Sequence, residues 1–270
     1  MGAEIGDVDL RKLSTSEFSA VREAHQTHGV IFFRDQQLSP EDHIEFAERW
    51  GEIDVNRFFK AVDGHPQIAQ VLKEPDQTIN IGGGWHTDHS YDEAPAMGSI
   101  LYAREVPEVG GDTLFAGMGA AYDALSSGFK EMLAALSACH SSRHVFGQKA
   151  PGSQVMGDRF GNAELATQDV VHPVVIRHPD TGRKLLYVNP GFTTSIEGWS
   201  PEESRALLRF LYQHAMQPAF STRFQWAPGS LAVWDNRSTW HFALNDYPGQ
   251  RRLMHRITVA GVPLDGLTGR

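Results

Sequence analysis

A glycine run followed by a histidine and an aspartate is the feature of this sequence best suited to chemistry. In GGGWHTD, residues 82–88, His86 and Asp88 stand two residues apart. On an extended strand, side chains two apart point to the same face, so an imidazole nitrogen and a carboxylate oxygen can converge on one metal ion. The glycines let the backbone turn tightly or approach a ligand closely. A His-x-Asp pair also arises by chance, so a metal site requires a third ligand from elsewhere in the chain.

His241 is the best-placed third ligand among the 13 histidines. It follows the strand-like SLAVWDN and a polar turn, and functional residues often lie on such connections. Together, His86, Asp88 and His241 form the candidate triad. Two histidines and one carboxylate make the facial triad of non-haem Fe(II) oxygenases, which leaves three coordination positions open. Zinc accepts the same ligands, usually in a closed or nearly closed tetrahedral site, so the residue types leave both metals open.

Two arginines lie on one face of a predicted strand further along the chain. In RRLMHRITVAG, strand alternation places Arg252 and Arg256 on one face and His255 on the other. Four residues along a strand span about 13 Å, so the two guanidinium groups are predicted to hold two different anions. A planar guanidinium suits a carboxylate or sulfonate because it donates two parallel hydrogen bonds. Surface ion pairs are the alternative, but beside a metal site an anionic co-substrate and an anionic substrate are favoured.

Helices and strands must hold these residues in place, and the sequence predicts many short strands with a few helices. Two of the helices begin at serine N-caps, Ser14 and Ser39, and the second has proline in its first turn. The predicted helices span residues 14–28, 38–51, 120–137 and 201–214. The predicted strands are VIFFRD, QIAQVL, SILYARE, VVHPVVIRH, KLLYVN, SLAVWDN and LMHRITVAG. This pattern favours an α+β protein built on a β-sandwich or barrel.

Composition excludes several classes of protein. With 270 residues, 41% of them hydrophobic, the chain can bury a sizeable core. Its formal net charge of −9 disfavours a nucleic-acid partner. No apolar run approaches the roughly 18 residues that span a bilayer, and the N-terminal segment has no apolar signal core. Cys139 is the only cysteine, which fits a reducing compartment. We therefore expect a cytoplasmic protein with no membrane partner.

Three separated blocks of the sequence resemble one known family. They are WHTDHSYDEAPAMGSILYAREVPEVGGDTLFAG, LLYVNPGFTTSI and WDNRSTWHFALNDYPGQRRLMHRITVAG. In this order they are similar to the taurine dioxygenase family of Fe(II)/2-oxoglutarate-dependent oxygenases, and the segment HSSRHVFG resembles the (R)-phenoxypropionate (aryloxyalkanoate) dioxygenases more closely. The resemblance implies a single domain over residues 1–270. It also implies an α+β fold whose core is a double-stranded β-helix, the jelly-roll or cupin-like architecture, with flanking helices.

The resemblance also implies roles for individual residues. The candidate triad would bind Fe(II) as the metal. Thr113, in GGDTLF, and Arg252 would hold the distal carboxylate of 2-oxoglutarate. Arg256 matches the family position that faces the anionic group of the substrate, although in some members this position is assigned to 2-oxoglutarate.

At the substrate pocket, the sequence differs from taurine dioxygenase. Asn56 and Phe59 fall at substrate-binding positions of the family but differ in type, and glycine near Gly82 replaces the asparagine that would hold an amine. Phe146 and Phe192 fall at or near other pocket positions. Each phenylalanine alone is more often ordinary core, but together they suit a larger and less polar substrate than taurine.

The predicted function is hydroxylation of a small anionic substrate with Fe(II), 2-oxoglutarate and O₂. The substrate would be a carboxylate, a sulfonate, a sulfate ester or a natural-product intermediate, and hydroxylation beside oxygen or sulfur would lead to C–O or C–S cleavage. Two other classes stay open, a cupin-like binder or sensor of a small acid and a zinc hydrolase on a similar barrel. The resemblance further implies a homodimer or homotetramer. Because GAEIGDVDL matches a point some residues into typical members, we expect either that a first strand is missing or that the start is truncated.

Overall fold

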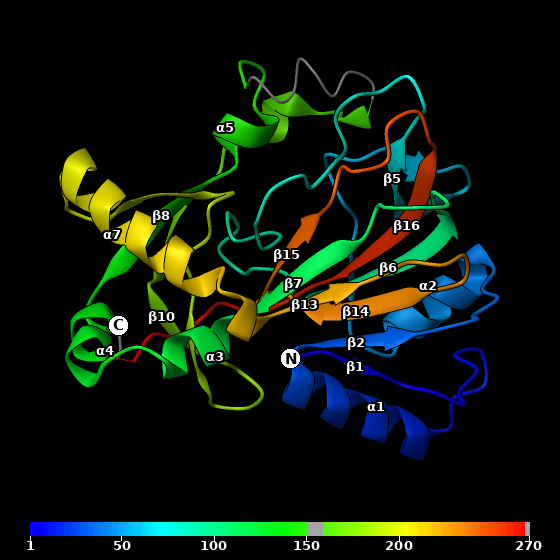
Figure 1. Cartoon of the computed structure of the whole chain (residues 1–270), viewed down its shortest axis with the longest axis horizontal. Helices are drawn as coiled ribbons and strands as arrows, with labels where there is room; N and C mark the ends of the chain where they lie inside the picture. Colours follow the sequence, from blue (N-terminus) through cyan, green and yellow to red (C-terminus); the bar gives the residue numbers. More distant parts are fainter. Residues whose placement is uncertain (151–158, 268–270) are drawn as a thin grey trace.

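Two facing β-sheets form the centre of the molecule in the computed structural model, which describes residues 1–150 and 159–267 (Figure 1). The major sheet has eight strands in the order β1-β2-β14-β6-β16-β5-β4, with β3 paired to β16. Its strands are β1 (Ala3–Glu4), β2 (Val30–Phe33), β3 (Ile53–Asp54), β4 (Ala61–Val62), β5 (His65–Lys73), β6 (Gly98–Glu105), β14 (Leu231–Asp235) and β16 (Arg252–Val259). The minor sheet has the order β13-β7-β15. Its strands are β7 (Thr113–Gly117), β13 (Ser221–Phe224) and β15 (Thr239–Ala243). Every pair but the parallel β1-β2 is antiparallel, as in the predicted jelly-roll.

Aromatic rings fill the space between the two sheets. Phe32 of the major sheet stacks on Phe224 of the minor sheet, with ring centroids 4.1 Å apart, and Phe115 packs on Trp234 at 5.7 Å. Alternation explains why β2 is apolar throughout. Phe32 faces the minor sheet while its neighbour Ile31 faces the helices on the other side, so both faces of the strand are buried.

Two helices cover the outer face of the major sheet. They are α1 (Thr15–His28) and α2 (Pro40–Glu48). Both predicted N-caps are confirmed, because the side chains of Ser14 and Ser39 each close a capping box. Gly29 ends α1 with a φ of 74°, a left-handed conformation that glycine adopts without strain.

A second group of elements covers the outer face of the minor sheet and lies apart from α1 and α2 in Figure 1. Its helices are α3 (Met118–Asp123), α4 (Ser127–Ala134) and α7 (Pro201–Ala215). Its strands form the sheets β12-β8-β9 and β10-β11. They are β8 (Ser137–Ser141), β9 (Asp169–Pro173), β10 (Val175–Arg177), β11 (Lys184–Leu186) and β12 (Thr193–Ile196). Three short helices complete the described elements, α5 (Arg143–Phe146), η2 (Ala163–Leu165) and η3 (Pro218–Phe220).

The single helix predicted over residues 120–137 is wrong. The chain leaves the helix after α3, and the Ser126 hydroxyl accepts a hydrogen bond from the Phe129 amide to start α4. Ser137 already belongs to β8. A serine that can cap a new helix competes with continuation of the old one, and apolar periodicity alone does not register this competition. Among the residues described, no helix combines the length and apolar character needed to cross a bilayer.

A buried histidine in α1 predicts how stability depends on pH. The His25 side chain is 3% exposed and its Nε2 has no hydrogen-bond partner, so burial lowers its pKa to about 4. Between pH 6.5 and 4 the unfolded chain binds a proton at this residue that the folded chain does not bind. The free energy of unfolding therefore decreases as the pH is lowered from 6.5 to 4, by on the order of 3 kcal/mol for this one group.

We expect His25→Leu to flatten the pH dependence of stability between pH 6.5 and 4, measured by urea unfolding at several pH values. His28→Leu is the matched control, because His28 is an exposed residue on the same helix and its replacement should leave the slope unchanged. Identical slopes for His25→Leu and the original chain would contradict the assignment.

Candidate metal centre and its cavity

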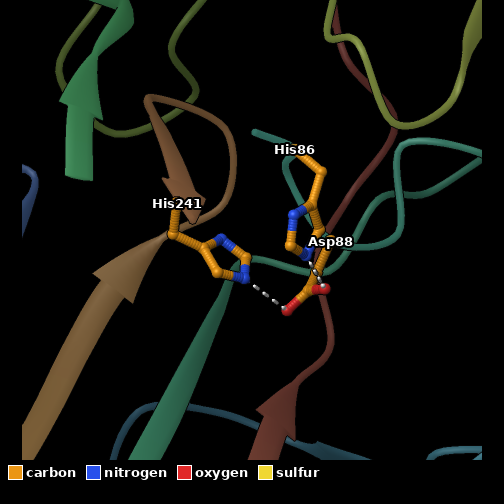
Figure 2. Close-up of side chains that lie close together, drawn as sticks. All are labelled: His86, Asp88 and His241. Carbon is orange, nitrogen blue, oxygen red and sulfur yellow. Dashed lines mark ion pairs between the residues drawn. The ribbon is translucent and has the colours of Figure 1, made fainter. Parts of the chain in front are cut away.

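Three side chains from two distant segments converge at one end of the β-sandwich (Figure 2). His86 Nε2 lies 3.7 Å from Asp88 Oδ1, and His241 Nε2 lies 3.9 Å from Asp88 Oδ2. A ligand atom lies roughly 2 Å from a first-row metal, so two ligands of one ion lie at most about 4 Å apart. The candidate triad is therefore brought together at separations that a single ion can bridge.

A short backbone contact joins the two histidines. The His241 amide donates to the His86 carbonyl at 2.8 Å, and the His86 amide donates to the His241 carbonyl at 3.1 Å. This pair is an isolated antiparallel bridge, so the expected strand through His86 and Asp88 is reduced to one bridged residue followed by a turn. His241 follows β14 and a polar turn, as predicted, and itself belongs to β15. The convergence thus comes from pairing with a distant strand more than from i, i+2 alternation.

The two rings are oriented in different ways. His86 Nδ1 lies 2.7 Å from the carbonyl of Gly84, so Nδ1 carries the proton and the Nε2 lone pair faces Asp88. His241 Nδ1 has no partner, and its ring is held by packing against Trp234 at a centroid distance of 4.7 Å. Burial and the neighbouring His86 hold the pKa of His241 well below its ordinary value, so the ring is neutral and can act as a ligand.

Asp88 is buried and has two hydrogen-bond donors on one oxygen. Its Oδ2 accepts from Ser99 Oγ at 3.1 Å and from Arg256 Nη1 at 3.0 Å. Burial alone would raise the pKa of this carboxyl, but the Arg256 guanidinium beside it lowers the pKa well below its usual range. Asp88 is therefore a carboxylate, the form that binds a metal. Two imidazole nitrogens and an ionised carboxylate are a donor set that fits Fe(II).

A cavity of about 420 Å³ opens beside the candidate triad. Arg252 and Arg256 both line it, as the alternation along β16 predicts, and Thr113 lines it from β7. Arg252 is 4% exposed, and its Nε and Nη2 have no partner among the described residues. Burial lowers the pKa of its guanidinium, and an unpaired buried cation is costly. The wall at Arg252 and Thr113 thus fits a carboxylate ligand such as the distal end of 2-oxoglutarate.

Aromatic side chains form the opposite wall. Phe59, Phe146 and Phe192 line the cavity, as predicted, and Phe160 joins them against Phe59 at a ring distance of 4.9 Å. Asn56 is not among the lining residues. Its Oδ1 instead accepts hydrogen bonds from the Phe58 and Phe59 amides, each at 3.0 Å, so it holds Phe59 in place.

Several residues of the site carry no signal in the sequence. Phe160 follows no motif, and Ser99 looks like any small residue of a strand. His144 lines the cavity and its Nε2 lies 2.8 Å from the Gly191 carbonyl. Gly191 itself packs directly on a triad member, because a Cβ built there would lie 2.6 Å from His86 Cβ. Each of these roles depends on contacts between segments far apart in the chain.

A second group of ligand-type atoms, from His178, Asp180 and Asp235, is already internally paired. Arg237 Nη2 donates to Asp180 Oδ2 and to Asp235 Oδ2, both at 2.6 Å, and His178 Nε2 lies 2.9 Å from Asp235. The carboxylates are neutralised by a guanidinium that lies where an ion would sit. This group is therefore an ion-pair network, buried at His178 and Asp235 and exposed at Asp180, that ties the turn after β10 to the end of β14.

Comparisons with known proteins agree with this geometry. Residues 1–258 match the family described as "Taurine catabolism dioxygenase TauD, TfdA family". An alkylsulfatase from Acinetobacter baylyi is 34% identical, with 100% of this chain and 85% of the relative covered. An alpha-ketoglutarate-dependent sulfate ester dioxygenase from Pseudomonas putida is 33% identical, with 100% and 90% covered. An (S)-phenoxypropionate/alpha-ketoglutarate-dioxygenase from Sphingobium herbicidovorans is 32% identical, with 97% and 92% covered.

Solved structures give the same result. The crystal structure of a putative alpha-ketoglutarate-dependent taurine dioxygenase from Burkholderia xenovorans matches with a TM-score of 0.85 and 35% identity, over 100% of this chain and 93% of that chain. The structure of AAD-2 in complex with Mn(II) and N-oxalylglycine matches with a TM-score of 0.80 and 30% identity, over 96% and 95%. These likenesses confirm the predicted α+β jelly-roll.

The contact between Gly191 and His86 predicts a specific loss of metal binding. We expect Gly191→Ala to weaken Fe(II) affinity by about tenfold or more, because the added methyl must push His86 away from the other ligands. Anaerobic titration with Fe(II) measures the effect. Gly128→Ala is the matched control, since Gly128 does not line the cavity and a Cβ there meets nothing within 4 Å, so the affinity should stay unchanged. Equal affinities in the two variants would show that this packing does not position His86.

Proposed function

The chain belongs to the taurine catabolism dioxygenase TauD, TfdA family and is an Fe(II)- and 2-oxoglutarate-dependent dioxygenase; from this premise we propose that its substrate is an organic anion with an apolar group larger than that of taurine. One observation carries the proposal. A single cavity combines the candidate triad, two buried arginines and a wall of phenylalanines. The candidate triad would serve the metal and Arg252 would serve 2-oxoglutarate. Arg256 and the aromatic wall are then left for the substrate.

The residues of the cavity divide the work. Fe(II) with 2-oxoglutarate and O₂ supplies the hydroxylation of an unactivated C–H bond, and 2-oxoglutarate leaves as succinate and CO₂. His86, Asp88 and His241 would hold the metal. Arg252 and Thr113 would hold the distal carboxylate of 2-oxoglutarate. The apolar wall keeps water away from the reacting carbon.

Arg256 would receive the anionic group of the substrate. One of its nitrogens, Nη1, donates to Asp88, while its buried Nε has no partner within the described part of the chain and can donate to a ligand. Its Cζ lies 4.5 Å from the centre of the Phe59 ring. A substrate whose anion meets Arg256 therefore lies with its apolar part along the phenylalanines. This geometry supports a sulfate ester, a sulfonate or an aryloxy carboxylate.

The named relatives act on such anions. A sulfate ester dioxygenase and a phenoxypropionate dioxygenase are both similar over nearly the whole chain. Hydroxylation at the carbon that bears the ester or ether oxygen gives an unstable product, which releases sulfate or a phenol and leaves a carbonyl. We also propose that residues 1–270 form one catalytic domain. A homodimer or homotetramer and a cytoplasmic location stay predictions.

Succinate formation against a substrate panel tests the proposal. Anaerobically purified protein receives Fe(II), ascorbate and 2-oxoglutarate, then air and one of a set of alkyl sulfates, sulfonates, aryloxy carboxylates or taurine. We expect stimulation by an apolar sulfate ester, sulfonate or aryloxy carboxylate that exceeds the stimulation by taurine. His86→Ala, Asp88→Ala and His241→Ala should abolish turnover in folded protein, while His28→Ala keeps it. No succinate from iron-loaded protein with any member would instead favour a non-catalytic binder.

The two arginines should separate in steady-state kinetics. We expect Arg252→Ala to raise the KM for 2-oxoglutarate roughly ten- to a hundredfold, because it removes a charge-assisted hydrogen bond to the co-substrate. Arg256→Ala should mainly raise the KM for the prime substrate. Arg251→Ala is the control, since Arg251 pairs with Glu74 at 3.0 Å and does not line the cavity. The opposite pattern of KM changes would exchange the two assignments.

A further inference from the structure

A tryptophan behind the cavity holds the hydroxyl of Thr113. Trp226 Nε1 lies 2.9 Å from Thr113 Oγ1, and both side chains are buried, at 8% and 2% exposure. An indole N–H is a donor only, so the direction of this hydrogen bond is fixed. Trp226 is not among the residues that line the cavity, and it can reach a ligand there only through its neighbours.

This hydrogen bond determines what the threonine hydroxyl can do. A hydroxyl has one proton and two lone pairs, and the indole N–H occupies one lone pair. The hydroxyl proton is thereby directed away from Trp226 and is free to be donated. On the cavity side, Thr113 shares a wall with the unpartnered guanidinium of Arg252. A carboxylate placed there accepts from both groups.

The fold fixes Trp226 in this position. Phe224 of β13 pairs in register with Thr113 of β7, and Trp226 follows two residues later. Its ring packs edge-on against Phe224 at a centroid distance of 4.8 Å. The Arg252 Cζ lies 5.9 Å from the centre of the same indole. One tryptophan therefore contacts both groups of the distal carboxylate site.

We propose that Trp226 is a positioning residue for the co-substrate, which orients the Thr113 hydroxyl so that it donates to the distal carboxylate of 2-oxoglutarate. This inference rests on the proposed function, because it requires that the co-substrate binds with that carboxylate at Thr113 and Arg252. Trp226 affects the bound dicarboxylate at one end only and leaves the metal end unchanged.

Calorimetric titration of the anaerobic Fe(II)-loaded protein tests the proposal without turnover. The ligands are 2-oxoglutarate and 2-oxobutyrate, which keeps the 2-oxo acid end but lacks the distal carboxylate. We expect Trp226→Phe to raise the Kd for 2-oxoglutarate about five- to tenfold, the effect of one hydrogen bond, and to leave the Kd for 2-oxobutyrate unchanged. Trp50→Phe is the matched control, because Trp50 is 7% exposed and its Nε1 has no partner.

A double-mutant cycle with Thr113→Val tests whether Trp226 acts through the Thr113 hydroxyl. If Trp226 acts through the hydroxyl, Trp226→Phe adds no further loss once Thr113 is valine. The proposal is overturned if Trp226→Phe binds 2-oxoglutarate as tightly as the original chain. It is also overturned if the losses of affinity from Trp226→Phe and Thr113→Val multiply in the double variant, or if Trp226→Phe weakens 2-oxoglutarate and 2-oxobutyrate equally. Failure of the original chain to bind 2-oxoglutarate at all would instead contradict the proposed function.

A spectroscopic measurement keeps the test decisive if Trp226→Phe does not fold. In the zinc-loaded protein, the indole N–H resonance of Trp226 reports its hydrogen bond directly. Thr113→Val should move this resonance and leave those of Trp50 and Trp234 in place, since neither of their N–H groups has a partner. An unmoved Trp226 resonance would overturn the proposal.

Discussion

A buried carboxylate and the groups that compensate its charge determine the rest of the site. Asp88 is 7% exposed at the end of an apolar sandwich, where an isolated charge would cost many kcal/mol. Ser99 and Arg256 both donate to its Oδ2, and the imidazoles of His86 and His241 face it. A divalent metal adds the remaining compensation. Arg256 is therefore fixed beside the candidate triad, with its guanidinium on the wall of the cavity.

The β-sandwich supplies rigidity where the site has few hydrogen bonds. His241 has no partner at Nδ1, so only aromatic packing holds its ring, by Trp234 from the major sheet and Phe115 from the minor sheet. The same rings belong to the core between the two sheets. The orientation of a metal ligand is thus tied to core packing, and precise sites require this kind of support. On the other side, the Gly84 carbonyl holds His86.

Local rules in the sequence predict the parts of the molecule that local physics determines. Alternation places Arg252 and Arg256 on one face of β16, and serine side chains cap α1 and α2 as expected. The parts of the site that the sequence does not predict also have a physical reason. The position of Trp226 relative to Thr113 follows from the pairing of β13 with β7, at a separation of 113 residues. Periodicity carries no information on such pairing, and it equally misses Phe160 in the aromatic wall.

The two arginines differ in their hydrogen bonds, and this difference explains how one fold can accept different substrates. Arg252 has two nitrogens without a partner among the described residues and lines the cavity together with Thr113. Arg256 already shares a hydrogen bond with Asp88 and lies against Phe59, a residue of the aromatic wall. A change of phenylalanine in that wall alters which apolar group fits, while the anion stays beside the metal. Specificity can therefore change at Phe146 or Phe160, because these rings pack on other phenylalanines of the wall, whereas Phe59 also packs on the guanidinium that donates to Asp88.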